Sequence, residues 1–211
     1  MARSGWSARS CRIRPGSRLQ GREMKIGIVS DTHGFFDARL PEVLTGAEVI
    51  LHAGDVGSQQ VLDELARIAP VQAVRGNVDT AELGLPPSRM LQFENVQVEV
   101  MHQLPFPQGE LKVWSDGALL EKVHPERREA FLQTFDKSTR VVVFGHSHQP
   151  CLLTMGHMLF FNPGSAGQQR FSLPRCVGLL EMFPRGIRGT VVSLERYNER
   201  VPAKVWLPIG E

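Results

Sequence analysis

Two histidines separated by one residue, His146 and His148, directly follow an apolar run in the stretch VVVFGHSHQP. Residues 141–144 have the length and the β-branched composition of a buried strand, and Gly145 lets the chain turn sharply after it. The two imidazoles therefore lie on a loop at a strand end. For this pair alone, metal ligation, proton transfer and an ordinary loop role all stay open.

Side chains of the same chemical kind recur wherever a strand is expected to end. These carboxylates, imidazoles and one amide are Asp31, His33, Asp55, Asn77, His102, His146 and His148. Because the carboxyl ends of the strands in an α/β sheet line one crevice, the side chains are expected to converge. Seven ligands are too many for a single zinc ion, which usually binds about four. They suit two ions about 3.5–4 Å apart, an arrangement that catalyses hydrolysis. A bridging residue must offer both oxygens, so an Asp rather than an Asn is expected between the ions.

The elements that must position these residues alternate between strands and helices in the first half of the chain. Strands are predicted at residues 25–30, 49–52 and from 71 onward. Helices are predicted at 37–45 and 58–69, and Ser58 is the expected N-cap of the second. This alternation predicts an α/β chain with a largely parallel sheet.

The second half is richer in strands. A strand at 96–103 precedes a long surface loop or small hairpin at 104–124, and Pro125 starts a helix that runs to about residue 138. After the strand at 141–144, the closely spaced stretches MLFFNPGS, CVGLLEM and GTVVSLERY are typical of a second sheet.

Residues 1–23 differ in composition from the rest of the chain. They hold six arginines and one acid, so residues 24–211 contain 18 basic and 21 acidic residues, a net charge of −3. The segment has no apolar periodicity, which predicts a disordered basic extension. Its composition suits an organelle transit peptide, but the clean beginning of MKIGIVSDTHG at Met24 favours a start codon assigned too far upstream. We expect this extension followed by one domain over residues 24–211.

Composition bounds the class of protein. With 211 residues, 42% hydrophobic and 22% charged, the chain has the values of a soluble globular domain with a sizeable core. No apolar run approaches the about 18 residues of a membrane span. Three cysteines make no disulfide framework, so a reducing cytoplasm is expected. The mildly acidic body indicates no extensive nucleic-acid surface, and a homo-oligomer stays open.

Six short motifs, taken together, resemble those of a known superfamily. SDTHG, AGDV, GNVD, MHQ, GHSH and NPGSAGQQR occur in this order after Met24. In these motifs the chain is similar to the calcineurin-like metallophosphoesterases, and most of all to their small bacterial and archaeal phosphodiesterase group. The resemblance implies a four-layer α/β sandwich, in which two stacked mixed β-sheets are flanked by helices.

The same resemblance implies a role for each ligand-type residue. Asp31, His33 and His148 hold the first metal ion, Asn77, His102 and His146 hold the second, and Asp55 bridges them. The residues expected to take part in catalysis are Asp55, Asn77, His102 and Asp79, of which Asp79 either orients a ligand or caps the GNVD turn. Manganese is the expected metal, with iron, nickel or zinc as alternatives. A small phosphoester, above all a phosphodiester, is the expected substrate, hydrolysed by a metal-activated hydroxide.

Two positions depart from the pattern of the superfamily. Many members carry a proton-donating histidine directly after the asparagine of GN, and the small phosphodiesterase group often has cysteine there, but this chain has Val78. The group usually has glycine after the ligand histidine of MHQ, where this chain has Gln103. The missing donor favours esters with good leaving groups over alkyl monoesters. The stretch 103–140 is long for the group and is a candidate cover for the cleft.

Two alternatives to a phosphodiesterase stay in view. The same fold serves as a non-catalytic protein-interaction scaffold in the retromer subunit that resembles these enzymes, although that subunit lacks several of the ligands. A nuclease of the superfamily would add DNA-contacting segments and keep the donor histidine. Outside the ligand set, His52 is expected to be a hydrogen-bonded core residue, and residues 162–165 are expected to buttress the site.

Overall fold

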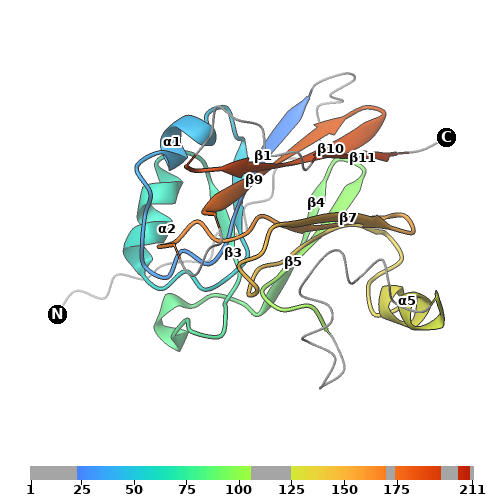
Figure 1. Ribbon diagram of the computed structural model, residues 1–211, viewed down its shortest axis with the longest axis horizontal. Helices are drawn as coiled ribbons and strands as arrows, with labels where there is room; N and C mark the ends of the chain where they lie inside the picture. Colours follow the sequence, from blue (N-terminus) through green and yellow to red (C-terminus); the bar gives the residue numbers. More distant parts are fainter. Residues whose placement is uncertain (1–22, 106–124, 170–173, 196–203, 210–211) are drawn as a thin grey trace.

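The computed structural model describes residues 23–105, 125–169, 174–195 and 204–209. The predicted N-terminal extension and the predicted loop at 104–124 therefore lie almost entirely outside the described residues. The described chain forms two β-sheets that face each other, with α1 and α2 at one side of the molecule and α5 at the other (Figure 1).

The first sheet has a parallel half and an antiparallel half. Its strand order is β11-β10-β9-β1-β2-β3. The strands are β1 (Met24–Val29), β2 (Val49–His52), β3 (Val71–Ala73), β9 (Cys176–Phe183), β10 (Gly186–Ser193) and β11 (Lys204–Pro208). β1, β2 and β3 pair in parallel, while β9, β10 and β11 are antiparallel to their neighbours. The parallel half brings the carboxyl ends of β1, β2 and β3 to one edge.

The second sheet is also mixed, with the order β4-β5-β6-β8-β7. Its strands are β4 (Ser88–Phe93), β5 (Val96–Met101), β6 (Thr139–Val143), β7 (Cys151–Met155) and β8 (Met158–Asn162). The central strands β5, β6 and β8 are parallel, and β4 and β7 flank them as antiparallel edges. All five residues of β8 are buried, as expected for a strand covered on both faces.

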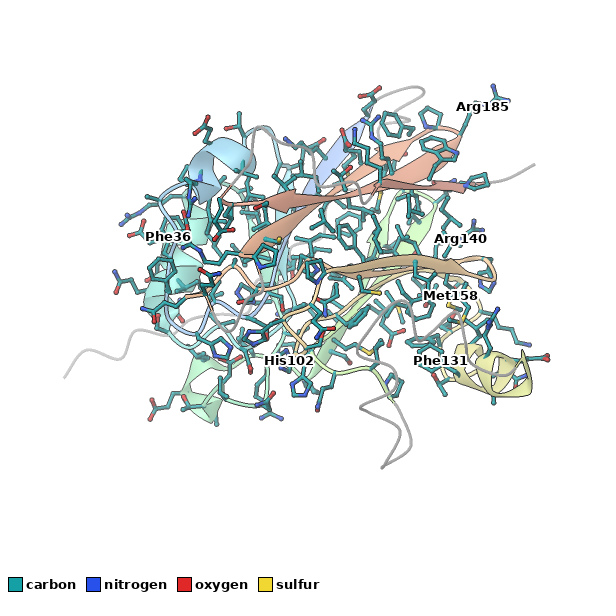
Figure 2. The ribbon with its side chains drawn as sticks, viewed as in Figure 1. Phe36, His102, Phe131, Arg140, Met158 and Arg185 are labelled. Carbon is teal, nitrogen blue, oxygen red and sulfur yellow. The ribbon has the colours of Figure 1, made fainter. Side chains whose placement is uncertain are left out.

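Three apolar clusters define four layers. Ile28 and Leu51 of the first sheet pack with Val98, Val141 and Phe161 of the second in the central cluster between the sheets. The outer face of the first sheet carries α1 (Leu40–Val43) and α2 (Gln59–Ala66), and the outer face of the second carries α5 (Pro125–Leu132). Figure 2 shows Phe131 of α5 beside Met158 of the second sheet, and both belong to the apolar cluster between α5 and that sheet. The predicted four-layer α/β sandwich of two mixed sheets is therefore confirmed.

Several predicted elements were wrong in extent or in place. The helix predicted at 37–45 is a single turn, because the Asp37 carboxylate accepts the Arg39 N–H at 2.9 Å and holds the chain in a turn before it. Ser58 is the N-cap residue of α2, as predicted, although its side chain makes no capping hydrogen bond. The helix starting at Pro125 ends at Leu132, six residues earlier than predicted.

The sheet membership of the C-terminal strands was also predicted wrongly. MLFFNPGS does enter the second sheet as β8, but CVGLLEM and GTVVSLERY, as β9 and β10, extend the first. β9 pairs antiparallel with β1 and so covers the edge that β1 leaves open on the side away from β2. β4, β7 and β11 were not predicted.

Two further sequence expectations can be compared with the described residues. Cys151 and Cys176 are buried, as predicted, while Cys11 lies outside the described part of the chain. Within that part, none of the helices has the length and apolar character needed to cross a membrane.

Candidate metal centre

The loops that follow β1 and β2 are held side by side by an extension of the parallel pairing. The Asp31 N–H donates to the Gly54 carbonyl at 3.0 Å, and the His33 N–H donates to the Asp55 carbonyl at 2.9 Å. This ladder places the SDTHG loop against the AGDV loop. In the second sheet, the loops that follow β5 and β6 are held together in the same way, because the Gly145 N–H donates to the His102 carbonyl at 3.1 Å.

Left-handed backbone is concentrated at the predicted ligands. Among the described residues, six other than glycine have positive φ, and five of them belong to the predicted ligand set: Asp31 (54°), His33 (48°), Asp55 (53°), His146 (71°) and His148 (58°). The sixth, Glu94, lies in the turn between β4 and β5. Such conformations cost about 1–3 kcal/mol each and gather at functional sites, where the surrounding structure fixes them. The backbone thus independently marks the same loops as the sequence motifs.

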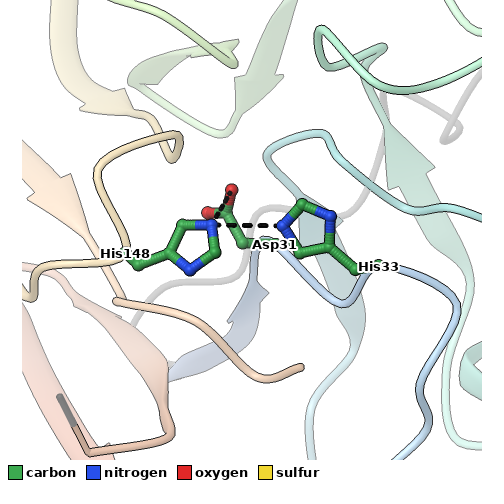
Figure 3. Close-up of side chains that lie close together, drawn as sticks. All are labelled: Asp31, His33 and His148. Atoms are coloured by element: carbon green, nitrogen blue, oxygen red, sulfur yellow. Dashed lines mark hydrogen bonds and ion pairs between the residues drawn. The ribbon is translucent and has the colours of Figure 1, made fainter. Parts of the chain in front are cut away.

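Asp31, His33 and His148 converge in one group (Figure 3). The Nε2 atoms of His33 and His148 are 3.1 Å apart, and His148 Nε2 lies 3.4 Å from Asp31 Oδ1. Asp31 is fully buried, and its carboxylate accepts the Ser30 hydroxyl at 2.5 Å and the His146 N–H at 3.1 Å. These contacts fix the carboxylate toward the two imidazoles.

Asn77, His102 and His146 form a second group. Asn77 Oδ1 lies 2.9 Å from His102 Nε2 and 2.9 Å from His146 Nδ1. His102, just beyond β5 (Figure 2), has its Nδ1 2.8 Å from the Ala53 carbonyl, which can only accept. Nδ1 therefore carries a proton, and Nε2 faces the Asn77 oxygen. Such an outer hydrogen bond fixes the tautomer of a metal-ligating histidine.

Asp55 stands between the two groups. Its Oδ2 lies 3.8 Å from His33 Nε2 and 3.4 Å from His102 Nε2, while its Oδ1 accepts the Val78 N–H at 3.0 Å. Oδ2 thus lies near a histidine of each group. The bridge through both oxygens stays a prediction. Burial acts to raise the pKa of Asp55, yet His102, the Val78 N–H and His33 outweigh it and lower the pKa to about 2. The carboxylate is therefore ionised at neutral pH.

The two histidines of the second group have opposite electrostatic surroundings. Burial acts to lower the pKa of His102, but the Asp55 carboxylate and the charge of Asp31 outweigh it and raise the pKa. Burial and the neighbouring His102 lower the pKa of His146. The anionic surroundings of His102 favour positive charge at its Nε2, whether a proton or a cation supplies it.

The donor set fits divalent metal ions. Ligand atoms about 2.0–2.2 Å from an ion, at roughly right angles, are about 3 Å apart. The His33–His148, His148–Asp31, Asn77–His102 and Asn77–His146 ligand atoms are 2.9–3.4 Å apart. His102 Nε2 faces both Asn77 Oδ1 and Asp55 Oδ2, three atoms that a shared cation would hold together. Asp31 also lies within 4.8 Å of the Asp55 and His102 ligand atoms, so its carboxylate is close to both groups.

Asp79 accepts hydrogen bonds from both the loop that carries Asp55 and the loop that carries Asn77. Its Oδ1 accepts the Gly57 N–H and its Oδ2 accepts the Gly76 N–H, both at 2.8 Å. Gly76 is needed there because a Cβ would lie 2.0 Å from Asp55 Oδ1. Both oxygens of Asp79 are thus engaged by the backbone, which supports a positioning role, and the same bonds also close the GNVD turn.

Asp79→Ala is expected to weaken metal binding about 10–100-fold, the usual loss when a partner of the ligands is removed. The effect arises because the loops of Asp55 and Asn77 lose their shared acceptor. Calorimetric titration of the metal-free variant measures it. Asp63→Ala, on an exposed face of α2, is the matched control. An unchanged affinity in Asp79→Ala would show that the two loops hold their places without the carboxylate.

Other residues support the site from beneath. His52 is fully buried, as predicted, and burial lowers its pKa to about 4. The Thr32 hydroxyl donates to the Val56 carbonyl at 3.0 Å and lies 2.9 Å from His52 Nε2, so it accepts from that ring. In the predicted buttress, Asn162 Nδ2 donates to the Gly145 carbonyl at 2.9 Å.

The roles of Ser30 and Thr32 were not foreseen. The signal in the sequence was their place directly beside Asp31, inside a loop that follows a strand. Short hydroxyl side chains at such positions commonly bond nearby backbone or carboxylate groups.

Fold and site together define an α/β protein with a metal-binding centre at the strand ends of two stacked mixed sheets. Residues 24–183 match the calcineurin-like phosphoesterase superfamily domain, and the chain belongs to that superfamily. A probable metallophosphoesterase of Methanothermobacter thermautotrophicus is 33% identical over 157 residues, which cover 72% of this chain and 82% of that protein.

Two solved structures share the fold. The Escherichia coli phosphoesterase YfcE has a TM-score of 0.57 and 23% identity, covering 87% of this chain and all of its own. Vps29 of Entamoeba histolytica, solved in complex with Zn²⁺, has a TM-score of 0.61 and 19% identity, covering 88% of this chain and 98% of its own. At these identities the likeness concerns the fold alone.

Proposed function

We propose that this protein is a dinuclear-metal-dependent phosphoesterase that prefers phosphodiesters. The observation that carries the proposal is the position of Asp55 Oδ2, with His33 on one side and His102 on the other. A carboxylate oxygen so placed is a natural bridge between two ions. The membership in a phosphoesterase superfamily supports the reaction class.

The mixed set of carboxylate, amide and imidazole donors favours manganese, with iron, nickel or zinc as alternatives. Two such ions supply Lewis acidity to a phosphoryl group and lower the pKa of water to near neutrality. Asp31, His33 and His148 would hold one ion, Asn77, His102 and His146 the other, and Asp55 would touch both.

The protein's own groups then position a small phosphoester. The pKa of about 2 keeps Asp55 ionised, so it can hold two cations at neutral pH. The Val78 N–H holds the other oxygen of Asp55, which leaves the Val78 side chain half-exposed beside the site. Valine gives the leaving oxygen no proton, so esters whose leaving group is already a stable anion are favoured.

The rival function is a non-catalytic scaffold of the same fold. The Zn²⁺ complex of Vps29, whose name stands for vacuolar protein sorting, shows that such a protein can bind a metal ion on this fold. Metal binding alone therefore does not separate the two functions. The convergence of all seven ligand-type side chains favours the enzyme, and turnover must decide.

The deciding experiment is a substrate screen on metal-free protein reconstituted with manganese, iron, nickel or zinc. Bis-aryl phosphodiesters, aryl monoesters and alkyl monoesters are compared, and we expect the diesters to be turned over fastest. His148→Ala, which removes one ligand of the first group, is the control for contaminating phosphatases. A folded, metal-loaded protein that turns over none of these esters would favour the scaffold.

A further inference from the structure

Gln103 contacts a predicted ligand from outside the ligand set. Its side-chain amide nitrogen lies 2.8 Å from Nε2 of His146, on the ring edge away from Asn77. The backbone pairing brings the two together, because the Gly145 N–H donates to the His102 carbonyl and so aligns the residues that follow. The superfamily pattern suggested glycine at this position, and glycine offers no such contact.

Both ring nitrogens of His146 have a polar neighbour. Nδ1 lies 2.9 Å from Asn77 Oδ1, one of the distances that suit a shared metal ion, and Nε2 lies 2.8 Å from the amide nitrogen of Gln103. The ring is further fixed by a T-shaped contact with His102, at 5.2 Å between ring centroids. Nδ1 of His146 thus faces Asn77, and Nε2 faces Gln103.

A neutral imidazole that binds a metal ion through Nδ1 carries its proton on Nε2. A glutamine amide can accept a hydrogen bond from that N–H, since rotation of its terminal group by about 180° presents the oxygen in place of the nitrogen. Glutamate can also accept it, whereas leucine and glycine cannot.

We propose that Gln103 is a positioning residue for His146: its amide holds the imidazole in place and so strengthens binding of the second metal ion. The inference rests on the proposed dinuclear function. Outer partners of ligating histidines orient the ring and are worth about 10–100-fold in metal affinity. The contribution of Gln103 falls on the second ion, because the residue that its amide contacts, His146, belongs to the second group.

Three variants test the proposal. Gln103→Leu removes the hydrogen bond and is expected to weaken the second metal site about 10–100-fold while leaving the first unchanged. Gln103→Glu accepts only, fixes Nε2–H, and is expected to bind the second ion at least as tightly as the parent. Gln103→Asp carries the same charge on a shorter side chain and separates the effect of charge from that of the hydrogen bond.

Two readouts are used on the full chain. Stepwise manganese affinity is measured by calorimetry, and nitrogen NMR reports the hydrogen bond at Nε2 of His146. We expect that hydrogen-bond signature in the parent and in Gln103→Glu, and its loss in Gln103→Leu.

The failures of the two proposals are distinguishable. A parent that binds fewer than two ions overturns the dinuclear function, while the NMR signature still tests the contact. Unchanged NMR signals and an unchanged second affinity in Gln103→Leu would overturn the role of Gln103. Because Gln103 is exposed, thermal unfolding of the metal-free variants is expected to match the parent and serves as the folding control.

Discussion

Asp55→Asn is expected to remove both metal ions and to lower turnover by about a thousand-fold. Oδ2 of Asp55 lies 3.8 Å from His33 Nε2 and 3.4 Å from His102 Nε2, so it faces a histidine of each group. An amide at this position loses the negative charge that two neighbouring cations share. A Lewis-acid ion is worth several kcal/mol of transition-state stabilisation, and each 1.4 kcal/mol corresponds to about tenfold in rate. Elemental analysis and steady-state kinetics on the same samples measure the two effects.

The matched comparisons are Asp31→Asn and His148→Ala. Both residues belong to the first group, so we expect each substitution to cause loss mainly of the first ion. Asp31 also lies near the Asp55 and His102 ligand atoms, so His148→Ala is the cleaner of the two. Equal and mild losses from Asp55→Asn and His148→Ala would contradict the bridging role.

Val78→His is expected to raise turnover of esters with poor leaving groups by up to about 10²–10⁴-fold, the usual worth of a positioned general acid. The Val78 backbone is anchored by its N–H bond to Asp55, and its side chain is 51% exposed. A larger ring therefore has room beside the site. The measurement is a series of aryl phosphodiesters with graded leaving-group pKa, with Val78→Leu as a control of similar bulk without a proton.

The parent is expected to show a steep dependence of rate on leaving-group pKa, and Val78→His a shallow one. The difference arises because a proton donor removes the need for an intrinsically stable leaving anion. A flat dependence in the parent, with chemistry rate-limiting, would show that another group supplies the proton. His102 and Asp79 would then be examined first.

The position of the site could be predicted from the sequence for a simple physical reason. Strand ends are marked by the switch from apolar runs to glycine and polar residues, and parallel pairing brings those ends to one edge. The β1–β2 and β5–β6–β8 parallel pairs do this in the structure. The assignment of each ligand to an ion stays a prediction, which the metal experiments above test.

The order of strands in the two sheets could not be predicted as well, because a local sequence pattern indicates a strand or a hairpin but not the sheet edge that the hairpin joins. β9 and β10 have the spacing of a hairpin in either sheet, and pairing with β1 decided the outcome. In the edge strands β4 and β11, most residues are exposed or half-exposed, so these strands lack the apolar runs by which the others were predicted. The role of Oδ2 in Asp55 and the contact of Gln103 depend on side-chain direction, which no sequence pattern encodes.

The most direct test of the dinuclear function is a manganese titration of metal-free protein in which bound metal and hydrolysis of a bis-aryl phosphodiester are measured in the same samples. The expected result is saturation at about two ions per chain, with turnover rising as the second ion binds. Saturation at zero or one ion per chain without turnover, or full turnover with one ion bound, would contradict it.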